Sequence, residues 1–225
     1  MTVPIRDKPL VERVYDAILD EICEGRLSPG VRIRQEDLAA DLDVSRQPVI
    51  QALGLLKAQG FVAPYGRKGL KVAELDPDMV VNLYEVRSAL ERLAVARAAG
   101  SASPTLRAEG EAAISDGWQA IADNSARGLI AADLRFHSAL WTAAGNPMIA
   151  EMLGGYWAHL RWAMRNILQI EGYAQQVQRE HAAILEAVMT GDTAHAEQLL
   201  TQHLNAAAET VAHELQAQKS RGEAA

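Results

Sequence analysis

Residues 44–73 read VSRQPVIQALGLLKAQGFVAPYGRKGLKVA, and this stretch decides the fold of the N-terminal part of the chain. Ser45 is a residue type that caps helices, and the apolar positions after it recur at helical spacing until Gly60. Two short apolar runs then flank the turn at residues 66–69, whose two glycines suit the tip of a β-hairpin. The stretch therefore predicts a helix followed by a basic hairpin.

The residues before this stretch predict two further helices. Apolar residues between Leu10 and Ile22 follow helical spacing, and Gly25 with the turn at residues 28–30 ends that helix. A short second helix is predicted at residues 35–41. Three helices followed by a glycine-tipped hairpin indicate a winged helix-turn-helix, in which the third helix enters the major groove of DNA.

Charge is unevenly distributed along the chain, whose 225 residues hold 29 acids and 22 bases for a net charge of −7. Residues 1–73 carry a net charge of +1, and residues 74–225 carry −8. Within residues 44–73 there are five bases and no acid. This asymmetry favours an anionic partner such as the DNA backbone. A winged helix that binds another protein stays an alternative, because a fold alone does not fix a function.

The candidate DNA-binding residues lie mainly at the start of the third helix and on the hairpin. Most can donate hydrogen bonds to phosphates or base edges, and the N-terminus of a helix itself favours phosphate. They are Arg34, Ser45, Arg46, Gln47, Gln51, Arg67, Lys68 and Gly69. Arg46 suits either a bidentate contact with guanine or a contact with phosphate, and the sequence leaves both open.

Length and composition limit the other classes of protein. A chain of 225 residues has room for one or two domains, and 49% apolar residues is ordinary for a globular protein. No apolar run approaches the roughly 18 residues of a membrane span, and the N-terminus lacks the apolar core of a secretory signal. The single cysteine, Cys23, excludes an internal disulfide. A cytoplasmic protein with no membrane partner is therefore expected.

Composition changes near residues 74–77, where we place a domain boundary. Short elements with glycine and proline precede it, and long Ala- and Leu-rich segments follow it. The predicted division is a DNA-binding domain at residues 1–74, an all-helical domain at 77–218 and a fraying tail at 219–225. The chain is thus expected to be mainly α, with an antiparallel bundle of six helices near residues 77–99, 104–123, 125–144, 148–170, 174–190 and 192–218.

An aspartate and three histidines of the helical domain form a candidate metal site. Asp133 and His137 are four residues apart and share a helix face, while His181 and His203 lie on the last two predicted helices. Side chains from three helices of a bundle can converge on one divalent cation, and such N/O ligands suit zinc, nickel, manganese or iron. The alternative, that each histidine is satisfied separately, is about as well supported by the spacing alone.

Other basic side chains of this domain lack such a pattern. His159, His195 and His213 have no partner at a telling spacing, and we expect them at the surface or between helices. Arg161 and Arg165 share a helix face, for which solvation is favoured over a place in a ligand cavity.

Residues 10–73 resemble the DNA-binding domain of GntR-type transcriptional regulators. The matching pieces are Gly25-x-Leu27-x-Pro29-Gly30, Leu38-Ala39, Val44-Ser45-Arg46-x-Pro48-Val49, Ala52-Leu53 and Gly69. Gln35, Asp43 and Ile50 depart from it, since the family usually has glutamate, glycine and a base-contacting arginine there. The resemblance implies a transcription regulator whose operator preference is altered, with Gln51 or Gln47 taking more of the readout.

Residues 77–217 resemble the FCD ligand-binding domain of the FadR branch of these regulators. The matching pieces are Glu85-Val86-Arg87-x-x-Leu90-Glu91, Asp133-x-x-x-His137, Ala144-Gly145-Asn146-Pro147, Glu180-His181, Gly191-Asp192 and His203. The resemblance implies that the Asp/His set binds a divalent metal ion and that a small carboxylate effector completes its coordination. Arg87 either clamps that carboxylate or pairs with Glu91 four residues later.

The sequence as a whole predicts a DNA-binding transcription regulator, and specifically a repressor, whose operator affinity responds to a small organic acid. A homodimer is expected, because a two-fold protein suits a palindromic double-stranded operator. Two alternatives stay open: a metal sensor without an organic effector, and a metal-dependent enzyme that uses the Asp/His site. The enzyme is disfavoured, because the chain has no HExxH, GxSxG or glycine-rich phosphate loop and the enzyme would not explain the basic winged helix.

Overall fold

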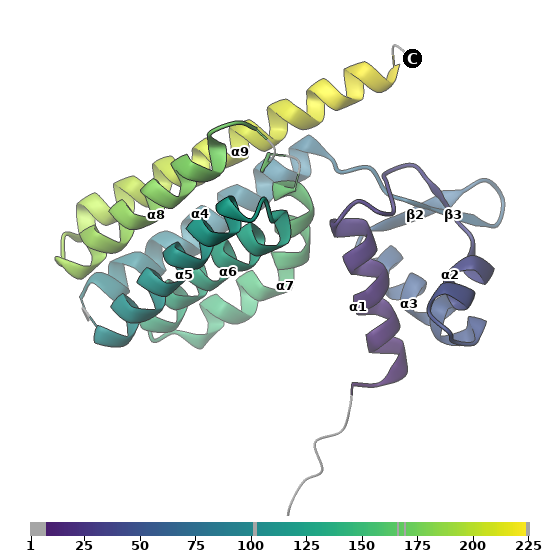
Figure 1. Ribbon diagram of the computed structural model, residues 1–225, viewed down its shortest axis with the longest axis horizontal. Coiled ribbons are helices and arrows are strands. Elements are labelled where there is room, and N and C mark those ends of the chain that lie inside the picture. The colour runs from purple at the N-terminus through teal and green to yellow at the C-terminus, as the bar shows by residue number, and fades with distance from the viewer. Residues whose placement is uncertain (1–7, 101–102, 166, 169, 224–225) are drawn as a thin grey trace, which may run out of the picture. The chain divides into compact units, whose positions relative to one another are not determined.

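A computed structural model describes residues 8–100, 103–165, 167–168 and 170–223 of the chain. These residues fall into two compact units, one within Met1–Leu75 and the other within Asp76–Ala225. The described residues are mainly helical, which confirms the predicted fold class (Figure 1). Among the described helices, none is long and apolar enough to cross a membrane.

The first unit contains the three predicted helices. They are α1 (Leu10–Cys23), α2 (Gln35–Asp41) and α3 (Arg46–Ala58). Helices α1 and α2 both pack against α3. The core between them is made of fully buried aliphatic side chains such as Ile18, Ile22, Val49, Leu53 and Leu56. The helical spacing of these residues is what directs them to one interior.

A small antiparallel sheet completes this unit. Its strands are β1 (Arg32–Ile33), β2 (Val62–Tyr65) and β3 (Gly69–Val72), in the order β1-β3-β2. The hairpin of β2 and β3 is the predicted wing, with Val62 opposite Val72 and Tyr65 opposite Gly69. Strand β1 was not expected from the sequence, because two residues are too few to give an alternating pattern.

Two turns of this unit depend on particular backbone conformations. Asp43, between α2 and α3, has φ of 51°, in the left-handed region that favours glycine. This conformation explains why glycine is usual at that position in the family that the sequence resembles. At the wing, a Cβ added to Gly69 would lie 2.6 Å from the backbone oxygen of Tyr65, so a side chain there would force the hairpin to shift.

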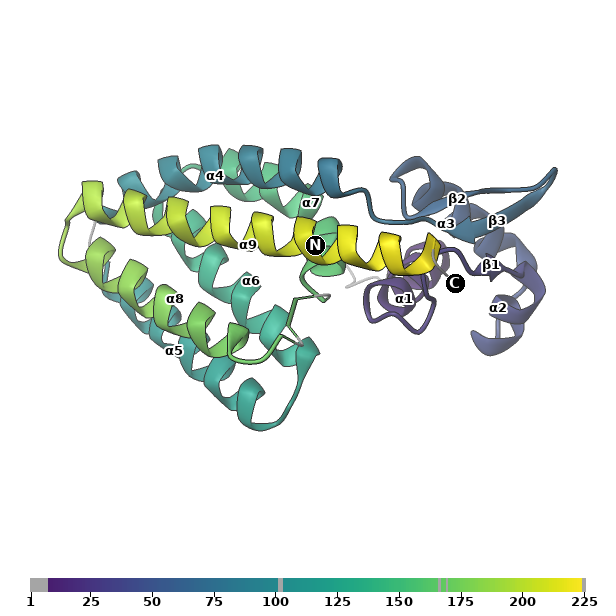
Figure 2. The same ribbon diagram turned by 90° about the horizontal axis from the view of Figure 1, so that it is seen from above.

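The second unit is the expected bundle of six helices within the described residues. They are α4 (Pro77–Ala99), α5 (Pro104–Ala122), α6 (Ala126–Ala143), α7 (Pro147–Met164), α8 (Tyr173–Met189) and α9 (Thr193–Glu223). Helix α9 lies alongside both α4 and α8 (Figure 2), while α6 packs against α4, α5 and α7. This packing turns one face each of α4, α6, α8 and α9 toward a common interior.

Helix ends in the bundle agree with the sequence at some positions and differ at others. Helix α7 ends at Met164, six residues before the predicted end, and Gly172 with φ of 78° then leads into α8. Helix α9 continues to Glu223, so residues 219–223 of the predicted tail are helical in the structure. An ion pair of 2.8 Å between Arg221 and Glu214 bridges these last turns.

The N-terminal caps of the helices differ in whether the side chain makes the capping hydrogen bond. At the start of α4, the Asp76 side chain accepts a hydrogen bond from the backbone N–H of Asp78 at 3.2 Å. Ser45 occupies the N-cap position predicted from the sequence, and Ser103 occupies the N-cap position of α5, but neither side chain makes a capping hydrogen bond. Ser45 is exposed, so water can satisfy the first-turn amides of α3 instead.

Helix α4 has an inward face that the apolar pattern of residues 77–99 predicts only in part. Helical spacing of apolar residues predicts Tyr84 and Leu93 inside; Tyr84 is buried, but the Leu93 side chain is 46% exposed. The buried face runs through Tyr84, Arg87, Glu91 and Val95. Two charged residues therefore occupy interior positions of the bundle, and they lie beside the candidate site.

Candidate metal centre and DNA-binding surface

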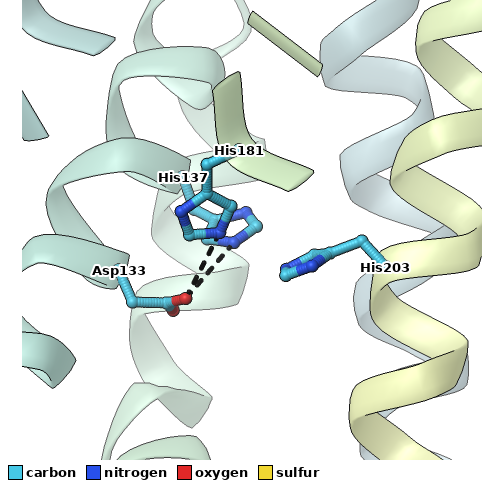
Figure 3. Close-up of side chains that lie close together, drawn as sticks. All are labelled: Asp133, His137, His181 and His203. Atoms are coloured by element: carbon cyan, nitrogen blue, oxygen red, sulfur yellow. Dashed lines mark ion pairs between the residues drawn. The ribbon is translucent and has the colours of Figure 1, made fainter. Parts of the chain in front are cut away.

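Asp133, His137, His181 and His203 meet inside the bundle. Helix α6 supplies the first two, α8 the third and α9 the fourth, and all four are buried. In Figure 3 the three imidazoles and the carboxylate point toward one another, with His203 extending from α9. Each offers one ligand atom, and these atoms lie within 4.8 Å of one another. The convergence that the spacing left open is thus found in the structure.

The geometry fits one divalent cation. Ligand atoms about 2.1 Å from an ion lie about 3 Å apart when adjacent and about 4.2 Å apart when opposite. Asp133 Oδ1 lies 3.5 Å from His181 Nε2 and 3.7 Å from His137 Nε2, so small side-chain movements suffice. Both of these Nε2 atoms and Asp133 Oδ2 lack a hydrogen-bond partner among the described residues. Buried polar atoms without partners are costly, and a bound cation would satisfy all three.

His137 is oriented by a carboxylate from a different helix. Its Nδ1 lies 2.6 Å from Glu91 Oε2 on α4. Burial would raise the pKa of Glu91, but the charges of Arg87 and His137 outweigh it and lower that pKa to about 2. The ionised Glu91 accepts the hydrogen bond, so Nδ1 carries the proton and Nε2 presents its lone pair to the cluster. Such outer carboxylates fix the ring and its tautomer in metal sites.

His203 has a corresponding partner in Glu180 on α8. Its Nδ1 lies 2.7 Å from Glu180 Oε2. Burial would raise the pKa of Glu180, but the hydrogen bond with His203 outweighs it and the pKa is lowered. Nδ1 of His203 therefore donates to an ionised carboxylate, and Nε2 is left as the ligand atom.

His181 is held by packing. Its ring stacks on Phe136, with centroids 4.0 Å apart and the ring planes 12° from parallel. Burial, followed by the neighbouring His203 and His137, lowers the pKa of His181 well below its ordinary value. Burial also lowers the pKa of His137, although Glu91 opposes this shift. Both imidazoles are therefore neutral near pH 7, the form that binds metal ions.

Arg87 lies beside the cluster and is already partly engaged. Its Nε donates to Glu91 Oε1 at 2.7 Å, so the i, i+4 pairing considered from the sequence exists. Its Nη2 lies 3.8 Å from Asp133 Oδ2 and has no hydrogen-bond partner among the described residues. The guanidinium also lies 5.5 Å from the centroid of the Tyr84 ring. One edge of its planar fork thus still has donor capacity.

A cavity of about 20 Å³ adjoins Arg87 and Asp133. Tyr84, Gln178 and His203 also line it, and Gln178 Oε1 has no hydrogen-bond partner among the described residues. This volume is the space of about one water molecule. The cavity thus presents a few polar groups among apolar side chains, and it must widen to admit an organic acid.

The other basic residues considered from the sequence lie outside the cluster. His195 and His213 are exposed on α9. His159 and Arg161 on α7 are half-buried, as is Arg165 directly after that helix.

The candidate DNA-binding residues lie on the winged helix unit. Seven of the eight are exposed, and Gly69 at the start of β3 is half-buried. Arg46 Nη2 lies 3.0 Å from Glu36 Oε1 on α2, so its side chain is already paired with an exposed carboxylate. Ile50 is 41% exposed on α3, where it places an apolar side chain among polar neighbours. Arg67 and Lys68 form the tip of the wing.

Spacing along one helix did not identify Glu91 and Glu180 as partners of histidine ligands. Glu91 follows Arg87 by four residues and Glu180 directly precedes His181, which were the only signals. Each contacts a histidine on another helix. The spacing of residues along one helix does not show which residues of another helix pack against it. Tyr84 and Gln178, which line the cavity, were missed for the same reason.

We expect the buried Arg87–Glu91 pair to matter far more for stability than an exposed pair of the same spacing. In metal-free protein, Arg87→Met leaves the buried charge of Glu91 without its cationic partner and with only the hydrogen bond from His137, which should cost about 3–5 kcal/mol of unfolding free energy. Arg107→Met breaks the exposed pair with Glu111, at 3.5 Å, and should cost less than about 1 kcal/mol. Urea unfolding of both variants, and of Arg87→Met/Glu91→Met, measures the difference.

The double variant should be more stable than the sum of its single losses predicts, because it removes the unpaired charge. The loss in Arg87→Met should also shrink as pH falls from about 4.5 toward 2. The pKa of Glu91 is lowered in the folded protein, so its stabilising effect is complete above its unfolded value and is lost as the carboxyl protonates. Equal losses in Arg87→Met and Arg107→Met would contradict this account.

Two known protein families match separate parts of the chain. Residues 10–72 match the family described as "Bacterial regulatory proteins, gntR family", and residues 82–206 match the FCD domain. These two matches confirm both resemblances inferred from the sequence.

Similar proteins are transcriptional regulators. An HTH-type regulator of the TAR-I ttuE-ttuC′ intergenic region of Agrobacterium vitis is 33% identical over 138 residues, 60% of this chain and 80% of its own. A D-xylose utilization operon transcriptional repressor of Paenarthrobacter nicotinovorans is 29% identical over 208 residues, 91% of this chain and 89% of its own. The crystal structure of a GntR regulator from Rhodococcus sp. RHA1 is 27% identical with a TM-score of 0.76, covering 89% of this chain and 96% of that one. With both halves matched, this chain belongs to the GntR family of transcriptional regulators, in the branch that carries an FCD domain.

Proposed function

We propose that this regulator is a repressor that binds a divalent cation at Asp133, His137, His181 and His203, and that a small organic acid bound there weakens its hold on a palindromic operator. The observation that carries the proposal is the burial of four ligand atoms within 4.8 Å of one another, inside a regulator of this family. Zinc, nickel, manganese and iron all accept such ligands. Residues 1–74 act as the DNA-binding domain and residues 77–218 as the effector domain.

The charges around the site favour an anionic effector. With neutral histidines, Arg87, Glu91 and Asp133 leave the buried site with a net charge of −1. A divalent cation changes this to +1, and a buried net charge is costly unless it is neutralised. A carboxylate supplies the missing negative charge, fills an open coordination position and accepts a hydrogen bond from Arg87 Nη2.

The small volume of the cavity links effector binding to a change of shape. About 20 Å³ does not hold an organic acid, so the acid binds only to an arrangement in which the neighbouring side chains or helices have moved. An effector releases DNA only if it binds the DNA-incompetent arrangement more tightly. A coupling of about 1–3 kcal/mol gives an affinity loss of about 5–150-fold.

At the operator, the N-terminal end of α3 reads bases in the major groove, and Arg67 and Lys68 of the wing contact the phosphate backbone. Gln51 or Gln47 takes more of the readout, because Ile50 stands where the family resemblance implies a base-contacting arginine. Two chains bind one palindromic site, because one small winged helix makes too few contacts alone. An enzyme is not supported by the family. A sensor of metal alone is the remaining alternative, and the effector experiment below separates it.

The first prediction concerns zinc binding at the proposed metal site. His181→Ala removes a buried ligand and should abolish the binding of one zinc ion per chain, measured by elemental analysis and by the zinc-induced rise in melting temperature. His195→Ala changes an exposed histidine on α9 and should leave both unchanged. A full complement of zinc in His181→Ala would contradict the site.

The wing should contribute nonspecific electrostatic affinity. Arg67→Ala and Lys68→Ala should each weaken binding to every DNA sequence and reduce the slope of log K against log salt by about 1. Fluorescence anisotropy on the duplex upstream of the protein's own gene measures both, with a stoichiometry of two chains per site. Lys219→Ala, an exposed lysine on α9, is the matched control. An unchanged salt slope in both wing variants would place the DNA elsewhere.

Effector response is tested on the zinc-loaded protein bound to that duplex. In a series of small organic acids, at least one should lower the affinity for DNA by about 5–150-fold, and metal-free protein should not respond. Arg87→Lys keeps the charge beside Glu91 but loses the planar fork, so the same acid should act only at about tenfold higher concentration or more. If zinc alone changes the affinity and no acid does, the chain is a metal sensor.

A further inference from the structure

His203 separates the buried cluster from a groove on the surface of the bundle. The groove has a volume of about 360 Å³ and runs between α8 and α9. His203 lines this groove and also lines the internal cavity beside Arg87 and Asp133. Asp133, His137 and His181 do not line the groove. Among the four residues of the cluster, His203 is thus the one that borders both the groove and the cavity.

The two faces of the groove follow from helical spacing. Glu180 and Ala183 on α8, like His203 and Ala206 on α9, are three residues apart and so lie on one face of their helix. These positions are short or polar, and Leu199 is the largest aliphatic side chain among them. Small side chains leave the space in front of His203 open.

Glu180 differs from Glu91 in its access to solvent, although both hold a histidine of the cluster. The Glu91 side chain is fully buried and fixed by Arg87. The Glu180 side chain is 30% exposed, faces the groove, and is otherwise held by a hydrogen bond of 2.8 Å from Gln176 Nε2. Among the described residues that line the groove, Arg179 is the one lysine or arginine, and it is exposed, so solvent screens its charge.

We infer that the divalent cation reaches and leaves its site through the α8–α9 groove, with Glu180 attracting it first and His203 closing behind it as the last ligand. This inference rests on the metal site proposed above. Glu180 is a positioning residue in the loaded state, because it holds His203 Nδ1. When the His203 ring turns outward, the same carboxylate lies at the opening and can draw a cation inward.

Two further grooves on the described part of the bundle lead less directly to the cluster. The groove between α4 and α9 meets the cavity at Tyr84, and a cation passing there would meet the buried positive charge of Arg87. The groove between α5 and α8 is lined by none of the four cluster residues. Its floor contains Leu185, whose side chain would lie 2.8 Å from a Cβ added to Gly110, so the two helices are tightly packed there.

A bulky side chain that fills the groove, here called a plug, tests whether the cation passes through the groove. Ala183 is exposed and lines the α8–α9 groove, so Ala183→Trp should slow both zinc association and zinc dissociation about tenfold or more. The Kd for zinc should stay within about twofold, because the loaded site is unchanged. Stopped-flow transfer of zinc to and from a fluorescent chelator measures both rates on the full chain.

The neighbouring alanine provides the control. Ala182 is also exposed but lines the α5–α8 groove, so Ala182→Trp should exchange zinc at the wild-type rate. If Ala183→Trp is poorly folded by circular dichroism, Leu199→Trp places the plug from the opposite wall. Wild-type exchange rates in a folded plug variant, or equal slowing in Ala182→Trp, would overturn the route.

A charge variant tests the part assigned to Glu180. Glu180→Gln should lower the association rate several-fold and raise the dissociation rate, with the affinity falling about 10–100-fold. Glu186→Gln removes an exposed charge from the same helix and should change neither rate. An unchanged association rate in Glu180→Gln would remove its attracting role. If wild-type protein binds no zinc, the proposed metal site is wrong. If it binds zinc but the plug variants exchange zinc at the wild-type rate, only the proposed route is wrong.

Discussion

The buried ion pair between Arg87 and Glu91 is the interaction on which the site depends. A bundle interior is a poor solvent for charge, so each buried charge must be matched by a neighbour. Glu91 is matched on two sides, by Arg87 on its own helix and by His137 on α6. These contacts join α4 to α6 through polar atoms and at the same time set which nitrogen of His137 is a ligand. The stability of the bundle and the chemistry of its centre thus come from the same side chains.

A second consequence is that the proposed cation would satisfy polar atoms that the bundle buries. Asp133 Oδ2 has only a long contact to Arg87, at 3.8 Å, and the Nε2 atoms of His137 and His181 have no hydrogen-bond partner among the described residues. Four helices therefore direct polar atoms into a volume where nothing else in the described chain satisfies them. Since α9 and α8 bring His203 and His181 while α6 brings the other two, binding at the centre fixes the spacing of three helices. A ligand that alters this spacing has a direct means of changing the shape of the whole domain.

Much of this arrangement could be predicted from the sequence, and the failures have physical reasons. The winged helix followed from helical spacing, the glycines of the wing and a known resemblance, and the convergence of the Asp/His set followed from the bundle and the FCD motif. The inward position of Glu91 did not follow from the sequence. An apolar pattern assigns charged residues to the surface, and on α4 it assigned Leu93 to the core. The helical conformation of residues 219–223 did not follow from the sequence either, because these residues are polar. In the structure, Arg221 pairs with Glu214 and the Ser220 hydroxyl donates to the Gln216 carbonyl. Pairings between helices are set by packing, which the spacing along one helix does not contain.

The two carboxylates that hold histidines divide the centre into a fixed side and an open side. Glu91 is inaccessible and its charge is already shared with Arg87, so His137 has one orientation. Glu180 faces solvent and is shared only with Gln176, so His203 is held by contacts that water can replace. If the cluster binds a cation as proposed, the buried side chains would retain it, and His203, which lines the α8–α9 groove, would let it exchange without unfolding of the bundle. The proposed acid effector would meet the cluster at Arg87, whose Nη2 lies 3.8 Å from Asp133 Oδ2.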